Sequence, residues 1–416
     1  MHSTKMMWLS SLMLVALLTP GMAHADIDPA AEYATLMARL NAAGRSAGRK
    51  GTPDFATVQQ EINLKLQADL KDIDPLKIEP SKGLGWAQLF NLAGQPQNAI
   101  MAAQVFLGSN PDASQKYRAQ ILILDQCIAT KDAVGIVKLT PAFAASDPMG
   151  AVQFALRVGF NIDIVADRQG IPAALELLKQ VEAKVAFDQL KTPAELNFGD
   201  FTISTLARAR ADLFNRIGKR TEALAALEAG RKRFKYDQDH FGDAIQAKAF
   251  ETKLIGSPAP PLIGDRVYGT FPGLDAYKGK IVLLHIFPRF RGSEYTSHYL
   301  SVTKKLYAEL HSKGLEVACV TPYYSAVEGK DHLTPDAEFA EMKNFITKYA
   351  VPWPVLYLEK STLEDYRLDN DYLHDSTLFP MYILIDRTGK VKSILVPNGE
   401  QTVNRLNRDI EELLNK

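Results

Sequence analysis

Residues 379–390 read Phe-Pro-Met-Tyr-Ile-Leu-Ile-Asp-Arg-Thr-Gly-Lys, and this stretch decides the fold of the C-terminal part of the chain. Its apolar run, residues 381–385, has the length of a buried strand, and a second run rich in β-branched and apolar residues follows at 391–396. The five residues between the runs include Asp386 and Gly389, which favour tight turns. The stretch therefore predicts a β-hairpin.

Segments typical of strands and helices alternate upstream of this hairpin, from Gly256 onward. Continuous apolar runs predict buried strands at 281–287, 315–320 and 355–358. Apolar stripes at helical spacing predict helices at 295–310, closed by Gly314, at 335–349, capped by Thr334, and at 403–413. This order predicts an α/β fold with a mixed central sheet covered by helices on both faces.

The C-terminal part, residues 256–416, resembles the thioredoxin superfamily, in its TlpA and redoxin (AhpC/TSA) branch. Besides the stretch 379–390, the resemblance rests on four segments, which are Gly256-Ser257-Pro258-Ala259-Pro260, Tyr277-Lys278-Gly279-Lys280, Gly314-Leu315-Glu316-Val317 and Pro352-Trp353-Pro354-Val355. It implies a thioredoxin-like fold, with a cis proline at Pro380 that faces the active site. It also implies chemistry at the point where the first strand ends and the next helix begins.

The cysteines that carry this chemistry in the family are missing here. The family's Trp-Cys-Gly-Pro-Cys segment, aligned without a gap, falls on residues 290–294, so that Arg291 and Glu294 stand in the places of the two cysteines. Residues 287–298 contain no cysteine at all. Because a guanidinium cannot attack a disulfide or a peroxide, the sequence predicts a degenerate site without catalytic residues.

The corner where the first predicted strand ends and the next helix begins has the residue types of a binding site. Arg289 and Arg291 flank Phe290 at a predicted helix N-terminus, where guanidinium groups and free backbone N–H groups suit a carboxylate or another anion. The remaining candidates for the cleft are Gly292, Ser293, Glu294, Tyr323, Tyr324, Phe379 and Pro380. The alternative is a solvated surface on which Arg291 pairs with Glu294.

The sequence favours neither a nucleophilic serine nor a metal site in this region. Ser293 lacks a base at helical spacing, since His298 is five residues away, and an N-cap role for Ser293 is favoured. The histidines His285, His298, His332 and His374 form no paired ligand motif, with His285 expected in a strand. No metal and no cofactor are predicted.

The chain has two cysteines, 192 positions apart, which excludes a disulfide framework. Cys127 and Cys319 each lie within an apolar run, which favours two small buried side chains over one long-range disulfide.

Residues 26–255 have helical periodicity throughout. Small and aromatic residues recur around Gly94, and again around Gly218, at the relative positions typical of tetratricopeptide helix hairpins. The segment around Gly170 is a candidate for a further hairpin, with a less regular spacing of these residues. This part resembles a degenerate tetratricopeptide-like domain, although any helical bundle would place alanines similarly. Partner docking and a plain lid or spacer both stay open as its role.

Residues 1–25 have the three parts of a secretory signal peptide, with a weakly positive start, an apolar run at 8–18 and the small residues Ala23 and Ala25 before the expected cut. The alternative is an uncleaved membrane anchor, but the apolar run at 8–18 is shorter than the roughly 20 residues that a helix needs to cross a bilayer. We expect a periplasmic or secreted protein with no stable membrane insertion after cleavage.

The charges balance, with 48 Lys+Arg against 48 Asp+Glu, so the net charge gives no reason to expect a nucleic-acid partner.

The favoured function is that of a non-catalytic protein, which binds a protein or peptide partner of the cell envelope. The alternative is a thiol-disulfide oxidoreductase or a peroxiredoxin-like antioxidant enzyme, and a third hypothesis is a non-redox enzyme using Arg291, Glu294 or Tyr295. The oligomeric state is not predicted.

Overall fold

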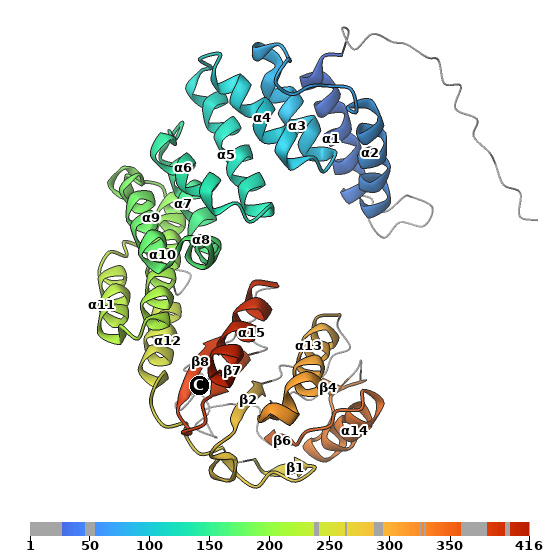
Figure 1. The fold of residues 1–416 in the computed structure, drawn as a ribbon, viewed down its shortest axis with the longest axis vertical. Coiled ribbons are helices and arrows are strands. Elements are labelled where there is room, and N and C mark those ends of the chain that lie inside the picture. Colours follow the sequence, from blue (N-terminus) through green and yellow to red (C-terminus); the bar gives the residue numbers. More distant parts are fainter. Residues whose placement is uncertain are drawn as a thin grey trace, which may run out of the picture. The chain divides into compact units, whose positions relative to one another are not determined.

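A computed structural model of the chain describes residues 27–45, 55–236, 241–262, 264–286, 294–323, 326–327, 330–358, 381–395 and 400–415 (Figure 1). The chain divides into two compact units, Met1–Gln126 and Cys127–Lys416. Between residues 27 and 254 the described secondary structure is helical, and strands begin only at residue 266. The predicted order of an all-helical part followed by a mixed sheet is confirmed.

The first unit is built from helices α1 (Pro29–Arg45), α2 (Phe55–Asp69), α3 (Gly83–Leu92), α4 (Pro96–Leu107) and most of α5 (Ala113–Ala129). Helices α3 and α4 form a hairpin that turns at Gly94, which has a φ of 67°. The amide of Gln95 donates to the carbonyl of Phe90, which satisfies the helix end in a Schellman arrangement. The helical hairpin expected around Gly94 is therefore present.

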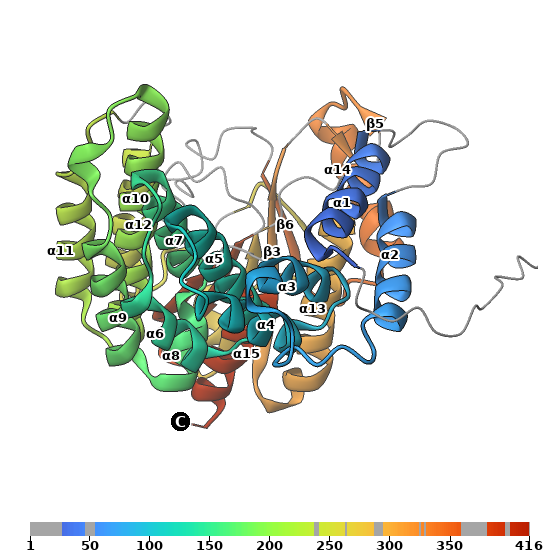
Figure 2. The ribbon, with the colours of Figure 1, turned by 90° about the horizontal axis from the view of Figure 1, so that it is seen from above.

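The second unit continues with seven helices, α6 (Ala133–Ala142), α7 (Pro148–Phe160), α8 (Ile162–Gln169), α9 (Ile171–Ala183), α10 (Pro193–Arg216), α11 (Arg220–Arg231) and α12 (Phe241–Leu254). Helices α10, α11 and α12 lie side by side (Figures 1 and 2). The turn between α10 and α11 repeats the first one, since Gly218 has a φ of 73° and the amide of Lys219 donates to the carbonyl of Phe214. Fully buried alanines, Ala211 and Ala223, let the two helices pack closely.

The sheet of the second unit contains β1 (Arg266–Tyr268), β2 (Ile281–Ile286), β3 (Leu315–Pro322), β6 (Val355–Leu358), β7 (Met381–Ile385) and β8 (Val391–Leu395) in the spatial order β1-β6-β3-β2-β7-β8. Strands β2, β3 and β6 are parallel to one another. Strand β1 pairs antiparallel with β6, β7 pairs antiparallel with β2, and β8 pairs antiparallel with β7. The predicted hairpin of β7 and β8 is present. The carboxylate of Asp386 accepts the amides of Thr388 and Lys390 in its turn.

Alternate side chains of these strands form two cores, one on each face of the sheet. The first core includes Leu283, Val317 and Leu384 and is covered by α13 (Glu294–Leu310), α14 (Pro335–Lys348) and α15 (Glu400–Leu414). The second core includes Leu284, Val320 and Ile383, and the described side chains that pack against it come from residues 254–277. Helices were expected on both faces. Within the described residues α13, α14 and α15 pack on the first core, and the segment 254–277, with the last residue of α12 and a short 3-10 helix at Leu274–Tyr277, packs on the second.

Two strand features of the second unit were not predicted. Strand β1 has only three residues, which is too short for a periodicity signal, and the hairpin of β4 (Ala326–Val327) and β5 (Lys330–Asp331) was also not predicted.

The predicted cap of α14 is present, since the side chain of Thr334 accepts a hydrogen bond from the amide of Ala337. Among the described helices no single one is long and apolar enough to cross a membrane, while α7 and α8 pass that test together as a pair bent by 50°.

The substitution Gly218→Ala should lower the free energy of unfolding by about 1 kcal/mol, because an L-residue in the left-handed region is strained. No atom lies within 4 Å of the Cβ that would be added, so the effect isolates backbone conformation from packing. Urea unfolding followed by circular dichroism measures it. Gly218→Asn is the control and should cost less, since Asn tolerates this conformation. Equal losses for both variants would contradict the backbone explanation.

Candidate functional site

The candidate site lies at the edge of the sheet where β2 ends. The register pairs Ile286, the last residue of β2, with Val320 of β3 and with Met381, the first residue of β7. The two segments that carry most of the predicted site residues therefore leave the sheet at the same edge. These segments, residues 287–293 and 359–380, lie outside the described residues, as does Tyr324. They contain Arg289, Phe290, Arg291, Gly292, Ser293, Phe379 and Pro380.

Two predicted site residues fall within the described part. Glu294 is the first residue of α13, so a helix does begin at the place expected from the sequence. Tyr323 directly follows β3, and its hydroxyl donates a hydrogen bond to the backbone carbonyl of Leu333. The ring of Tyr323 packs against the first core, so this side chain ties the loop after β3 to the sheet.

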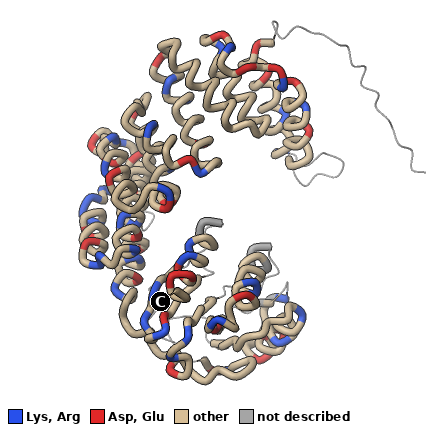
Figure 3. Tube along the Cα trace, viewed as in Figure 1, with Lys and Arg blue, Asp and Glu red and all other residues tan. Residues whose placement is uncertain are grey.

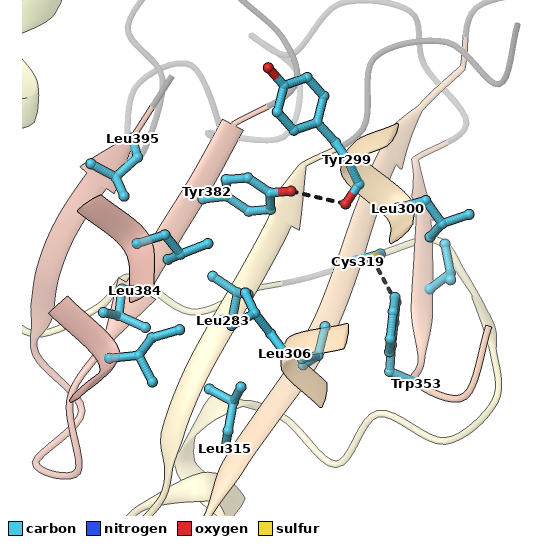
Figure 4. Packing of buried hydrophobic residues seen from close by; sticks show 14 of the residues in the cluster. Leu283, Tyr299, Leu300, Leu306, Leu315, Cys319, Trp353, Tyr382, Leu384 and Leu395 are labelled. Carbon is cyan, nitrogen blue, oxygen red and sulfur yellow. Dashed lines mark hydrogen bonds between the residues drawn. The ribbon is translucent and has the colours of Figure 1, made fainter. Parts of the chain in front are cut away.

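A buried polar cluster lies beneath this corner and joins β2, α13 and β7. The Oγ1 atom of Thr303 lies 2.8 Å from Nδ1 of His285 and 3.3 Å from the hydroxyl of Tyr382. The hydroxyl of Thr303 donates to the backbone carbonyl of Tyr299 at 3.0 Å. The hydroxyl of Tyr382 donates to the same carbonyl at 3.1 Å (Figure 4). The cluster therefore joins the N-terminal half of α13 to β2 and β7.

Burial keeps His285 neutral in this cluster. Its ring is fully buried and lies against the ring of Tyr382, with 4.4 Å between the ring centroids. Desolvation lowers the pKa of His285 from its ordinary value near 6.5 to about 3. An imidazole with such a pKa is neutral at physiological pH and serves here as a hydrogen-bonding and packing group.

Both thiols of the chain are buried. Cys127, in α5, is 1% exposed, and burial together with the nearby carboxylate of Asp132 raises its pKa to about 11. Cys319, in the middle of β3, is 0% exposed, and burial raises its pKa well above the ordinary range. The indole N–H of Trp353 donates to its sulfur at 2.7 Å (Figure 4). Since the thiolate is the reactive form, neither side chain is placed or ionised for thiol chemistry.

The described residues contain no group of three or more His, Cys, Asp or Glu side chains that could hold a metal ion. Of the histidines, His298 and His332 are exposed, His285 is buried in β2 as expected, and His374 lies outside the described residues. Both cysteines of the chain are free, so the long-range disulfide considered from the sequence is not formed.

The polar cluster was not predicted from the sequence. Thr303 lies four residues after Tyr299 on the predicted helix, and His285 and Tyr382 are the polar residues within two otherwise apolar strands. Those isolated polar positions were the available signal, because a buried polar group needs a hydrogen-bonding partner. Only the register that places His285 opposite Tyr382 shows which partners they have.

Solved structures of thiol-disulfide interchange proteins and related proteins resemble part of this chain. A putative thiol:disulfide interchange protein DsbE from Chlorobium tepidum is 19% identical over 38% of this chain and 97% of that one, with a TM-score of 0.29. The thioredoxin domain of a thiol-disulfide oxidoreductase from Bacteroides vulgatus is 23% identical over 37% and 96%, with a TM-score of 0.28. A putative protein disulfide isomerase from Bacteroides thetaiotaomicron is 16% identical over 39% and 91%, with a TM-score of 0.31. These likenesses concern the fold alone. No family model and no curated protein matches the chain.

The buried His285 predicts a specific loss of stability in acid. Its pKa is lower in the folded than in the unfolded chain, so only the unfolded state binds a proton as the pH falls below about 6.5. The free energy of unfolding should therefore drop by about 2 kcal/mol from this residue between about pH 7.5 and pH 5. Urea unfolding of the wild type and of His285→Phe across this range measures the difference in slope.

His298→Phe serves as the matched control, because His298 is an exposed histidine on α13. The pH dependence of this variant should follow that of the wild type. Parallel curves for the wild type and His285→Phe would show that His285 is not buried in its neutral form.

Proposed function

We propose that this chain is an exported thioredoxin-fold protein without dithiol chemistry, which binds a protein or peptide partner of the cell envelope. The observation that supports it best is the burial of both thiols, Cys127 in a helix and Cys319 in a central strand. Residues 287–298, where the family's reactive cysteines stand, contain none. A fold alone does not imply an activity, and the residues at this corner lack the required nucleophile.

The binding part of the proposal rests on the same corner. Arg289 and Arg291 come between the end of β2 and the start of α13, and the start of β7 lies beside the end of β2. Positive side chains near a helix N-terminus suit a carboxylate or another anionic group of a partner. The helical region, with its glycine-turned hairpins, resembles a tetratricopeptide-like array and would add a second docking surface.

The absence of dithiol chemistry is tested by insulin reduction with dithiothreitol. The wild type should not exceed the rate of dithiothreitol alone, because no accessible thiolate is present. The double variant R291C/E294C, which places cysteines at the two family positions, should raise the rate by about an order of magnitude, since a cysteine at a helix N-terminus has a lowered pKa.

Cys319→Ser is the control for the native thiols and should leave the wild-type rate unchanged. Turnover by the wild type that is lost in Cys319→Ser would overturn the proposal in favour of the oxidoreductase alternative. A peroxidase assay with the same proteins tests the peroxiredoxin-like alternative in the same way.

The binding role is tested by pull-down from an envelope extract with the wild type and R289A/R291A. Partners that bind through an anionic group should be lost from this variant, because each arginine supplies a charge-assisted hydrogen bond. R39A/R45A removes two arginines of α1 instead and should retain every partner. Unchanged partners with R289A/R291A would remove these arginines from the binding site.

A further inference from the structure

The C-terminal helix α15 carries two different faces. Leu406, Ile410 and Leu413 are buried in the first core, so one face packs on the sheet. The charged side chains Arg405, Arg408 and Asp409 alternate with these apolar positions, and Figure 3 shows basic and acidic residues along the helix. Because residues three and four apart share a helix face, the two arginines lie on one side of α15.

Both arginines reach acidic residues of the helical region in the same unit. A guanidinium nitrogen of Arg408 donates to the carboxylate of Asp167, in α8, at 2.7 Å. The guanidinium of Arg405 lies 3.6 Å from the carboxylate of Asp212, in α10. These two ion pairs join residues that are about two hundred positions apart in the sequence, 408 with 167 and 405 with 212.

The two acidic residues also belong to ion pairs within the helical region. Arg216 binds Asp167 at 2.6 Å and Asp163 at 3.0 Å. Lys248, in α12, binds Asp212 and Glu251, each at 2.8 Å. The result is a network in which α8, α10, α12 and α15 share charged groups of both signs.

Part of the network is protected from solvent, whereas the side chains of Arg408 and Asp167 are 30% and 45% exposed. The side chains of Arg216, Lys248 and Arg405 are 13%, 14% and 17% exposed. Although burial alone would raise the pKa of Asp212, the charges of Lys248 and Arg405 hold it below its usual range. Partly buried pairs are screened less by salt than exposed ones, and removal of one partner leaves the other uncompensated.

The chain that connects the helical region to the sheet makes a second attachment. After α12 the amide of Gly256 donates to the carbonyl of Val391, and the amide of Val391 donates to Ser257. The amide of Ala259 also donates to the carbonyl of Gly389. The connection is therefore hydrogen-bonded to the start of β8 and to the turn before it, through backbone groups that take no part in the ion pairs of α15.

We propose that the helical region of residues 127–254 and the thioredoxin-like sheet are held as one rigid body by an ionic clasp. The clasp consists of Arg405 and Arg408 on α15 with Asp212 and Asp167, and residues 255–259 are the hinge. Two separate attachments fix the orientation of the sheet relative to the helical region, whereas the hinge alone would allow the sheet to rotate. Release of the clasp frees the sheet to swing about the hinge while each part stays folded around its own core.

The clasp is tested by electron-spin distance measurements on the full chain. Spin labels are attached at Lys179→Cys, in α9, and Lys278→Cys, in the sheet region, whose side chains are 78% and 66% exposed. The native thiols are buried, so the two introduced cysteines are labelled selectively. The otherwise unchanged chain should give one narrow distance distribution, and R405A/R408A should broaden it about twofold, as for domains joined by a linker alone.

Lys392→Ala is the matched control, because Lys392 pairs with Glu412 of α15 at 2.9 Å but lies on β8 of the same sheet. This variant should keep the narrow distribution, and so should R405K/R408K, which retains the charges. If R405A/R408A fails to fold, Asp167→Asn breaks the bond to Arg408 at a half-exposed carboxylate and should also broaden the distribution.

A broad distribution before any clasp substitution would overturn the proposal. A distribution that stays narrow in folded R405A/R408A, or in Asp167→Asn when the double variant does not fold, would overturn it too. Neither result depends on whether the chain binds a partner, so the clasp and the proposed function are tested separately.

Discussion

Strand β2 is the element on which the rest of the C-terminal part depends. All six of its residues are buried, and it has hydrogen-bonded neighbours on both sides, β3 in parallel and β7 antiparallel. Its alternate side chains enter the two cores on opposite faces of the sheet. Because no residue of this strand faces solvent, a register shift of one position would move every side chain into the wrong core. Its last residue, Ile286, pairs with Val320 of β3 and with Met381, the first residue of β7.

The chemistry of the corner follows from what is buried beneath it. A thioredoxin-like fold supports thiol exchange only when a cysteine stands at a helix start, where it is ionised and accessible. In this chain the two thiols are instead packed as small apolar groups, with Cys319 beside Trp353 in the core. The polar cluster of His285, Thr303 and Tyr382 instead joins α13 to β2 and β7 through hydrogen bonds.

Much of the fold was predictable because its signals are local. The bounds of β6 and β7 agree with their apolar runs, and Gly94 and Gly218 turn the helical hairpins as their positions indicated. Strand β1 was missed because three residues carry no periodicity, and its pairing with β6 joins segments about ninety positions apart. The candidate site was predicted mainly from the resemblance. The polar cluster below it depends on strand register, which no local pattern encodes.

The sequence by itself determined the order of elements, the glycine turns and the loss of cysteines at the corner, because residue type and spacing decide these directly. Tertiary structure decided which polar groups meet. It brought His285 to Tyr382 across a strand pair and Arg408 to Asp167 across 241 positions. It also decided that, among the described residues, α13, α14 and α15 pack on one face of the sheet and the segment 254–277 packs on the other. Burial is a property of the whole packed chain, so it alone could show that neither thiol is available.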